Sequence, residues 1–533
     1  MRALAEPESR RACEHGMPRS RRVLVAAAAS FALAALLMLP VIHAGFHAED
    51  FGWLALARLS TSPWPLLAHN INFVYFYRPL PLLLWWLSAH VFGTQAVWHN
   101  ALDVLLHALN AALVCMLATR VSGRAGAGAL AGLLFASLPA GAATAAWMSD
   151  RFDLVALGFS LLALLSFEAA LRRRQNPTWT ALWLLCALLS KEVAYAAAAV
   201  MLARLAVQWW RDRAVAWGLL AAVALTPLVA LALRVLSGTT VGASLDVDDP
   251  LQAIAAGVGG WWRQAPSALS GFAPVSLWFG TLVAALLLVT VWGVARAQPK
   301  AAAPVRNLAL IGAGLLLLPA VLQWPVTAPV LSHDESRAFV VNLRFYYAAT
   351  AGLALLLAAG YAALPRGVAR AGMFTAGLLS AVGAAALSYR LSDQWAQDLS
   401  GSSQAYLALG ADLGARPFPA GCRIHLDTPA WNGSFRHHAD TIIKAAAPVD
   451  APVQSCAIFS GEQVYQTFVP APLCTPAQWP GLTFSERNGV PIAGSVGAVC
   501  MLQFVTYTAP EQLGQPLFRF RVDAQGHAQE EGD

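Results

Sequence analysis

Long apolar runs separated by small groups of basic residues occupy most of the chain, and this pattern constrains the fold more than any other feature. Hydrophobic residues make up 58% of the 533 residues and charged residues only 12%, whereas soluble domains carry about 25% charged residues. An apolar run of about 20 residues is long enough to cross a bilayer as a helix. The sequence therefore excludes a disordered chain, a coiled coil and a cytosolic enzyme, and indicates an all-α polytopic membrane protein.

The basic residues indicate how the chain is oriented. The net charge is +6, but the basic residues are spread in small groups between apolar runs, which is typical of the cytoplasmic ends of membrane helices and not of a nucleic-acid surface. Residues 1–22 contain six arginines and precede an apolar run at 23–44. This start resembles a signal peptide, but the run is long enough to span a bilayer. We therefore expect a cytoplasmic N-terminal tail and a retained first helix.

Five further basic groups divide the apolar region into pairs of helices. If each group is cytoplasmic, two spans must separate consecutive groups. This predicts about 11 membrane helices in a domain at 23–390, with outer loops at 45–97, 236–274 and 326–344. After the first helix, spans are predicted at about 98–119, 125–143, 152–171, 178–190, 193–209, 214–235, 275–295, 307–325, 345–363 and 369–389. The short apolar run at 79–92 is expected to lie along the outer membrane surface as a helix.

Residues 391–533 differ in composition, with more proline, glycine and polar residues and short alternating stretches. A segment of this length can form its own core, and we predict a small soluble α/β domain on the periplasmic side. Four of the seven cysteines lie here, and in an oxidising compartment they predict two disulfides with three alternative pairings. A zinc site is the weaker alternative, because no Cys-x-x-Cys pair is present. The four residues are Cys422, Cys456, Cys474 and Cys500.

Isolated ionisable residues gather at the predicted outer ends of the helices, although each would cost roughly 2.5–3.5 kcal/mol at the centre of a span. Glu49 and Asp50 directly follow the first helix. They form either a solvated helix start, which acidic residues favour, or a site where one carboxylate takes a proton from an acceptor hydroxyl. Neighbouring residues on a helix point about 100° apart, so only one of the two can face a given ligand.

Basic residues are predicted at the same level. Arg78 opens the surface helix among aromatic residues, and either snorkels to lipid headgroups or contacts the phosphate of a lipid-linked substrate. Asp150 and Arg151 form either a local ion pair, worth about 0–1 kcal/mol if exposed, or a site together with Asp153, which lies one turn into its span. Lys191 and Glu192 occupy a tight turn, and they form either a helix-end ion pair or a part of the same site. The last candidates are Arg337 and Arg344, before the tenth span.

A face of the second span carries His99, Asp103 and His107 at four-residue spacing. This geometry is compatible with a metal, but hydrogen bonding between helices is the favoured interpretation. No Gly-rich phosphate-binding loop is present in the sequence, which argues against a nucleotide-sugar or ATP substrate. We predict no cofactor, and a divalent metal is not indicated, although the sequence leaves it open.

Taken in order, these motifs resemble one known superfamily. After the acidic pair come Tyr-Arg-Pro-Leu at 77–80, a Phe-Gly break at 92–93, His-Ala-Leu-Asn at 107–110, Ser-Asp-Arg at 149–151, Leu-Ser-Lys-Glu at 189–192 and Glu-Ser-Arg at 335–337. This order is similar to that of the GT-C superfamily of integral-membrane glycosyltransferases, over about residues 23–390. The resemblance is greatest to bacterial members related to protein O-mannosyltransferases, of the glycosyltransferase family 39 type, and to the tetratricopeptide-carrying mannosyltransferases of animals.

The resemblance implies a hexosyltransferase that moves a sugar from a polyprenyl-phosphate-linked donor to an acceptor at the periplasmic face of a bacterial inner membrane. The first outer loop of the family supplies the catalytic carboxylate, which matches Glu49 or Asp50. Because the family more often has Asp at the first position, the choice between the two stays open. The donor phosphate is then expected on Arg78, Arg151, Lys191, Arg337 and Arg344, with Asp150, Asp153, Glu192 and His107 as further site residues. The acceptor, whether protein, glycan or lipid, is not indicated.

Two other classes are the alternatives. A lipid-linked sugar flippase or transporter also has many spans, but transporters usually show internal repeats and helices broken at mid-membrane. This sequence shows no repeat, and its isolated charges are predicted at one face only. In the other alternative, the membrane domain anchors the periplasmic domain without catalysis.

Overall fold

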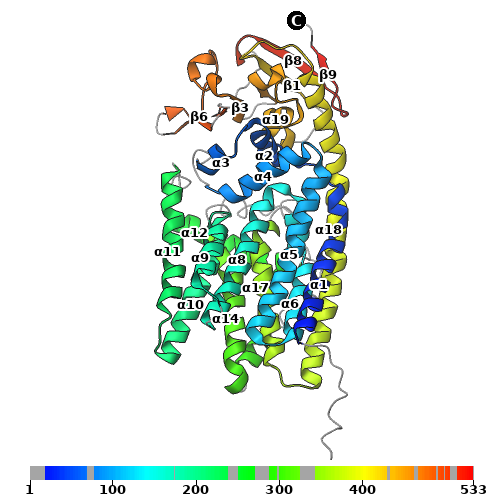
Figure 1. Cartoon of the computed structure of the whole chain (residues 1–533). Helices are drawn as coiled ribbons and strands as arrows, with labels where there is room; N and C mark the ends of the chain where they lie inside the picture. Colours follow the sequence, from blue (N-terminus) through cyan, green and yellow to red (C-terminus); the bar gives the residue numbers. More distant parts are fainter. Residues whose placement is uncertain are drawn as a thin grey trace, which may run out of the picture.

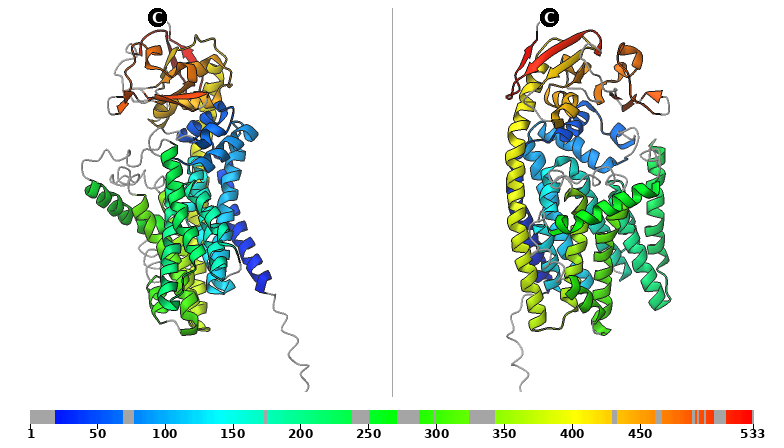
Figure 2. Two further views of the ribbon diagram at one scale, coloured as in Figure 1. Left: turned by 60° about the vertical axis from the view of Figure 1, so that its left-hand side comes forward. Right: turned by 180° about the vertical axis from the view of Figure 1, so that it is seen from behind.

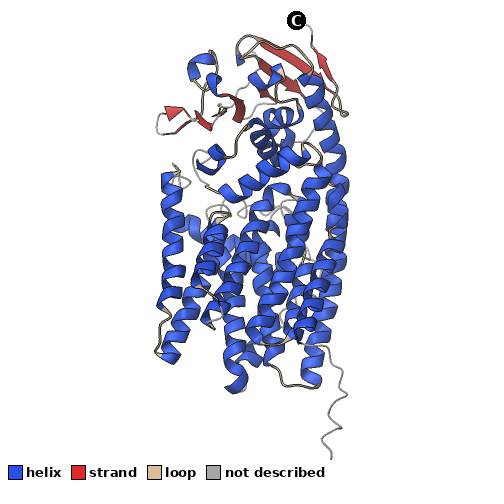
Figure 3. Ribbon diagram, in the orientation of Figure 1, coloured by secondary structure: helices blue, strands red, loops and turns tan. Residues whose placement is uncertain are grey.

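A computed structural model shows a helical bundle, a layer of short helices at one end of it and a small α/β domain beyond that layer (Figure 1). The structure describes residues 19–68, 77–172, 175–237, 250–270, 287–296, 299–323, 343–428, 433–460, 466–487, 490–491, 493–496, 498–503 and 513–531. Strands occur only at the end of the described chain that carries the α/β domain (Figure 3).

The bundle identifies a multi-pass membrane protein. Eight helices of the described residues are long and apolar enough to span a bilayer, and the bent pair α6–α7 would make nine. The described residues do not confirm the predicted number of about 11, because α9 has only 12 residues and the span predicted at 275–295 lies mostly outside them. The bundle consists of α1 (Arg19–Leu37), α5 (Ala96–Ser122), α6 (Ala125–Ser137), α7 (Ala140–Ala146), α8 (Arg151–Leu171), α9 (Pro177–Leu188), α10 (Tyr195–Asp212), α11 (Trp217–Leu236), α12 (Pro250–Ser270), α14 (Pro299–Leu322), α17 (Tyr347–Ala363) and α18 (Val368–Gly414).

Local sequence explains two features of the bundle. The helix α6 ends before Leu138, which takes an extended conformation with ψ 136° because it precedes Pro139; α7 then continues at an angle of 55°. Between α14 and α17, the backbones touch at Gly312 and Gly352: a Cβ atom on Gly352 would lie 2.3 Å from the backbone N of Leu316. Small residues permit such close packing between membrane helices.

The turns between α5 and α6, α10 and α11, and α17 and α18 lie at the end of the bundle away from the α/β domain (Figures 1 and 2). These turns hold three of the basic groups. The arrangement places those groups at one end of the bundle and the isolated acidic and basic residues at the other.

A layer of short helices covers the second end of the bundle. It comprises η2 (Leu39–His43), α2 (Ala48–Leu59), α3 (Trp64–Ala68) and α4 (Pro79–Phe92). Proline at the first position favours a helix start, and α4 begins at Pro79. The α4 helix lies across the ends of the bundle helices (Figure 1), as predicted for the apolar run at 79–92.

The C-terminal part is an α/β domain, as predicted. Its first sheet has the order β2-β1-β8-β9, in which β1 pairs in parallel with β2 and β8, and β8 pairs antiparallel with β9. The second sheet, β3-β7-β6, is antiparallel. The elements are β1 (Arg423–Asp427), α19 (Gly433–Ala446), β2 (Ala457–Phe459), β3 (Gln466–Pro470), β4 (Glu486–Arg487), β5 (Val490–Pro491), β6 (Ala493–Val496), β7 (Val499–Gln503), β8 (Leu517–Val522) and β9 (Ala528–Glu530).

The proposed domain boundary at 390 lies inside α18. This helix runs without a break from Val368 to Gly414, so the membrane domain and the α/β domain share one continuous helix. The α/β domain therefore begins after Gly414, where α18 ends.

Two disulfides stabilise the α/β domain. Cys422 pairs with Cys456, and Cys474 pairs with Cys500. The first joins the residues that immediately precede the paired strands β1 and β2, and the second joins β7 to the segment after β3. This is one of the three pairings that the sequence left open, and it leaves none of the four thiols for zinc.

One hydrophobic core connects the α/β domain to the layer of short helices. It contains Phe51 and Leu54 of α2, Trp85 of α4, and Ile442 and Ile443 of α19, all completely buried. The α/β domain is therefore packed on the layer and is not a separate module on a linker.

Candidate active site

Most of the predicted ionisable residues that the structure describes lie where the bundle, the layer of short helices and the α/β domain join. Glu49 and Asp50 lie in the first turn of α2, and Arg78 is the N-cap of α4. Two 3-10 turns carry other members, η3 (Met148–Asp150) and η4 (Glu192–Ala194), and a third, η5 (Leu343–Tyr346), carries Arg344. Arg337 lies outside the described residues.

The Asp50 carboxylate is completely buried and accepts three hydrogen bonds. Its Oδ1 accepts from the backbone N–H and the hydroxyl of Ser149, both at 2.6 Å, and its Oδ2 accepts from the backbone N–H of His47 at 2.8 Å. Burial raises the pKa of Asp50 to about 7, and the hydrogen bonds from Ser149 and His47 oppose this rise. Asp50 is thus a buried helix cap that joins α2 to η3, and its side chain offers no accessible surface to a substrate.

Glu49 has the opposite environment. Its side chain is 44% exposed, and its Oε2 lies 4.0 Å from Nη1 of Arg344. Of the acidic pair, Glu49 is therefore the carboxylate that a substrate can reach, beside a cation.

Arg344 connects Glu49 with Asp150. Its Nη1 lies 3.3 Å from Oδ1 of Asp150, and its guanidinium lies over the ring of Trp147 at 3.9 Å. Oδ2 of Asp150 and Nε of Arg344 are buried and make no hydrogen bond to the described residues. This ion pair therefore retains one acceptor and one donor for a further partner.

Three more ion pairs lie at the same end of the bundle, and two of them share Glu192. Lys191 pairs with Asp153, which lies in the first turn of α8. Glu192 accepts from Nε and Nη2 of Arg78 at 3.1 and 2.5 Å, and also pairs with Nη1 of Arg234 at 2.8 Å. Arg234 was not among the predicted residues, although a lone arginine in the last turn of an apolar helix is a detectable signal.

Arg151 is enclosed in the protein. Its guanidinium is completely buried and forms a bidentate pair with Asp103, at 2.6 and 3.1 Å. It also donates to Ser88 Oγ at 3.0 Å and lies over the Trp85 ring at 4.3 Å. Since the guanidinium is buried and each of its three nitrogens already donates a hydrogen bond, a phosphate role for Arg151 has no support in this arrangement.

His107 lies deeper in the bundle and does not join the ion pairs. Its Nδ1 lies 2.9 Å from the Tyr347 hydroxyl, which also receives a hydrogen bond from Asn110 at 3.1 Å. These contacts join α5 to α17, as expected for polar groups between membrane helices. No group of three or more His, Cys, Asp or Glu residues suited to a metal occurs in the part of the chain that the structure describes.

The arrangement can perform acid–base chemistry beside an anion. An accessible carboxylate, Glu49, lies next to Arg344, and two further cationic groups, Lys191 and the pair Arg78–Arg234, lie at the same end of the bundle. Every one of these cations pairs with a carboxylate of the protein, but Arg78 and Arg234 share Glu192, so that group keeps one positive charge in excess.

Comparison with solved structures defines the fold. No family model and no curated protein matches the sequence. ArnT from Cupriavidus metallidurans bound to undecaprenyl phosphate is similar with a TM-score of 0.51 and 11% identity, over 91% of this chain and 98% of that chain. The oligosaccharyltransferase of Archaeoglobus fulgidus, tethered with an acceptor peptide, gives a TM-score of 0.42 and 14% identity over 80% of this chain and 64% of that chain, which is too low to support an argument.

The similarity to ArnT extends over nearly the whole of both chains. The fold is therefore the fold of ArnT, in agreement with the GT-C fold that the order of the sequence motifs implied. At 11% identity the similarity shows the fold and not the chemistry of the site.

Proposed function

We propose that this protein is a membrane glycosyltransferase that transfers a sugar, of the hexose class, from a polyprenyl-phosphate-linked donor to an acceptor at the periplasmic face of a bacterial inner membrane. The observation that carries the proposal is the accessible Glu49 carboxylate beside Arg344, at the end of a GT-C bundle where other cations also gather. The ArnT structure with the same fold contains undecaprenyl phosphate, a lipid of the proposed donor class.

Glu49 is the proposed base. General base catalysis requires a carboxylate within reach of the acceptor hydroxyl, and Glu49 is exposed where Asp50 is enclosed. Asp50 has a different proposed role: its three hydrogen bonds fix the start of α2, which carries Glu49.

The cations are the proposed phosphate site. As the bond between the anomeric carbon and the phosphate oxygen breaks, its electron pair moves to the phosphate. A cation about 4 Å away contributes on the order of 4 kcal/mol at an effective dielectric near 20. Arg344, Lys191 and the Arg78–Arg234 pair are proposed to supply this charge. Arg337, outside the described residues, stays a candidate.

The proposed reaction is a direct displacement. The acceptor hydroxyl oxygen bonds to the anomeric carbon of the sugar while the carbon–oxygen bond to the phosphate breaks. The hydroxyl proton passes to Glu49, and the polyprenyl phosphate leaves with the electron pair. No oxidant, reductant or nucleotide is required.

Transfer of radiolabelled sugar from a polyprenyl-phosphate donor by the purified full chain tests the proposal. We expect the Glu49→Gln variant to lose about 100- to 10,000-fold in rate, the typical contribution of a general base. The matched control is Glu530→Gln, an exposed glutamate of β9, which should retain the wild-type rate.

Two outcomes would overturn the proposal. A wild-type protein that moves the intact donor across a vesicle membrane without cleaving it would be a flippase. A Glu49→Gln variant with the wild-type rate would remove Glu49 as the base, and in that case the Asp50→Asn variant shows whether the second carboxylate of the pair has that role.

A further inference from the structure

Helices α2 and α19 lie side by side with complementary apolar faces, although they come from opposite ends of the sequence. Each helix has buried apolar residues at a helical spacing of three and four residues. They include Phe51, Leu54 and Ala55 on α2 and Phe435, Ala439 and Ile442 on α19. A Cβ atom on Gly52 would lie 4.0 Å from Oγ1 of Thr441, an ordinary contact distance, so α2 and α19 are in contact at this point.

Arg58 connects the last turn of α2 to α19 by hydrogen bonds. Its Nη1 donates to the carbonyl oxygens of Ala445 and Ala447, the second at 3.3 Å. The last carbonyls of a helix have no partner within the helix, and a cation there also interacts favourably with the helix dipole. Arg58 thus supplies a cap from α2 to the C-terminal end of α19.

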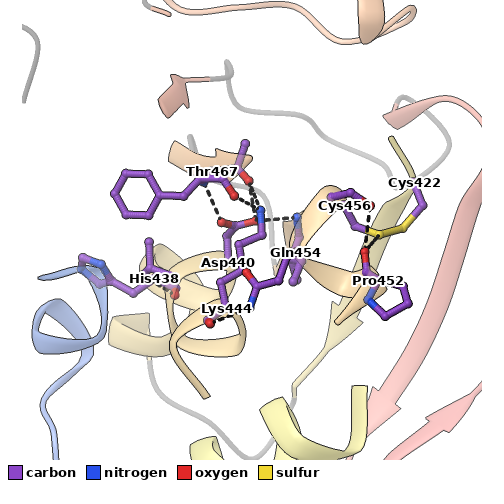
Figure 4. Close-up of polar contacts among 12 residues, drawn as sticks. Cys422, His438, Asp440, Lys444, Pro452, Gln454, Cys456 and Thr467 are labelled. Carbon is purple, nitrogen blue, oxygen red and sulfur yellow. Dashed lines mark hydrogen bonds and ion pairs between the residues drawn. A yellow bond between two sulfur atoms is a disulfide. The ribbon is translucent and has the colours of Figure 1, made fainter. Parts of the chain in front are cut away.

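A buried ion pair holds α19 in the α/β domain (Figure 4). Asp440 and Lys444 are both completely buried, with Oδ1 and Nζ 3.1 Å apart. Asp440 also accepts from the backbone N–H groups of Ile458 in β2 and Phe468 in β3, at 3.0 and 3.1 Å, and Lys444 donates to Oγ1 of Thr467 at 2.8 Å. Because removing either partner would leave an uncompensated buried charge, α19 is a firm part of the α/β domain.

His438 reaches the other end of α2. Its side chain points from α19 away from this buried pair and toward the α2 segment (Figure 4). Burial, together with the nearby charges of His438 and Arg344, lowers the pKa of His47 to about 4. His47 precedes α2 and donates its backbone N–H to Asp50. The α/β domain therefore binds the last turn of α2 through Arg58 and places His438 near the start of the same helix.

We propose that α19 is a positioning element of the transferase site, in which the contact with Arg58 holds α2 so that Glu49 meets the acceptor hydroxyl. This inference rests on the proposed function, and it assigns a part of the C-terminal α/β domain to the reaction. Arg58 does not touch the reacting atoms in this arrangement; it acts through the position of α2.

The positions of the cations predict which kinetic constant a displacement of α2 would change. Among the proposed phosphate-binding residues, Arg234 lies on α11 and Arg344 on η5, whereas Arg78 and Lys191 lie just before α4 and η4. None of them lies on α2. A displaced α2 therefore weakens the base without weakening the binding of the donor. The expected signature is a lower kcat with an unchanged KM for the donor.

The test compares Arg58→Met and Arg58→Lys in the full chain with a matched control, Arg416→Met. Arg416 also donates to a backbone carbonyl of the α/β domain, that of Ala528 at 2.5 Å, and pairs with Asp412 at 3.1 Å, but it binds β9 to α18 and makes none of these contacts with α2. A misplacement of about 1 Å can cost about 100-fold in rate. We expect Arg58→Met to lower kcat by about 10- to 100-fold, with the donor KM unchanged, and Arg58→Lys to restore part of the rate. Arg416→Met should match the wild type.

Two further measurements keep the test decisive. If Arg58→Met does not fold, Arg58→Lys supplies the comparison and should show a lower kcat than the wild type with the donor KM unchanged. Hydrogen exchange of the α2 amides, which needs no activity, should be faster in Arg58→Met than in Arg416→Met. An active wild type with unchanged kcat in the Arg58 variants, or equal α2 exchange in Arg58→Met and Arg416→Met, would overturn the inference. Absence of sugar transfer by the wild type would instead overturn the proposed function and the inference with it.

Discussion

Asp150 and Arg151 are neighbours in the sequence, and each forms an ion pair with a residue from a distant segment. Arg151 pairs with Asp103 in a completely buried, bidentate contact. Asp150 pairs with Arg344 through a single contact at 3.3 Å, and the Arg344 side chain is 17% exposed. Nε of Arg344 and Oδ2 of Asp150 make no hydrogen bond within the described residues, whereas the Arg151–Asp103 pair also binds Ser88 and the backbone.

The difference separates a structural ion pair from one suited to a ligand. A fully satisfied buried pair has no capacity for another partner, and breaking it leaves an unpaired charge in the protein. A pair with an unused donor and an unused acceptor can exchange its partner for a ligand of the same charge. Two adjacent residues can therefore serve stability and binding separately.

The largest effect is expected from breaking the enclosed pair. Arg151→Ala leaves the Asp103 carboxylate buried without a partner, which typically costs about 3–5 kcal/mol of stability. Thermal unfolding of the purified protein in detergent should show a much lower Tm. An Arg151→Ala protein with wild-type Tm and weakened donor binding would reverse the two roles.

The open pair should respond more in binding than in stability. Arg344→Ala removes a charged hydrogen-bond donor from the proposed phosphate site, which is worth about 1.5–3 kcal/mol, or a rise of about 10- to 150-fold in the donor KM. The Tm should fall less than in Arg151→Ala, because Arg344 makes a single contact with Asp150, whereas Arg151 forms a bidentate pair with Asp103. Equal KM values for Arg344→Ala and wild type would contradict the assignment.

The smallest effect concerns Asp50, a third kind of buried carboxylate that has hydrogen bonds but no ion pair. Burial raises its pKa from 3.8 to about 7, so the folded protein binds this proton more tightly than the unfolded chain. Its contribution to stability is therefore full below pH 3.8 and falls as the pH rises toward 7. Between pH 6 and pH 8 the loss should be about 1 kcal/mol. Unfolding of Asp50→Asn at both pH values should lack this component, and an identical pH dependence in both proteins would exclude it.

The sequence analysed alone predicts the gathering of charges at one end of the bundle, because hydropathy and basic groups together determine the topology. It also predicts the surface helix at 79–92 and the α/β character of the C-terminal part. The partners of the charges depend on helix packing: Asp103 lies 48 residues from Arg151, and Arg234 lies in an apolar run. Nor does hydropathy indicate that α18 continues past residue 390, since its second half is polar. The choice between Glu49 and Asp50 requires the contact with Ser149, which no local pattern contains.

The length of α18 has a mechanical consequence. At 1.5 Å per residue, its 47 residues form a rod about 70 Å long. Because this helix is continuous, the height of the α/β domain above the bundle and its rotation about the helix axis change together. Each inserted residue would raise that domain by about 1.5 Å and turn it by about 100°. Changes of whole turns would therefore preserve its orientation, whereas a single insertion would twist the domain off the helices beneath it.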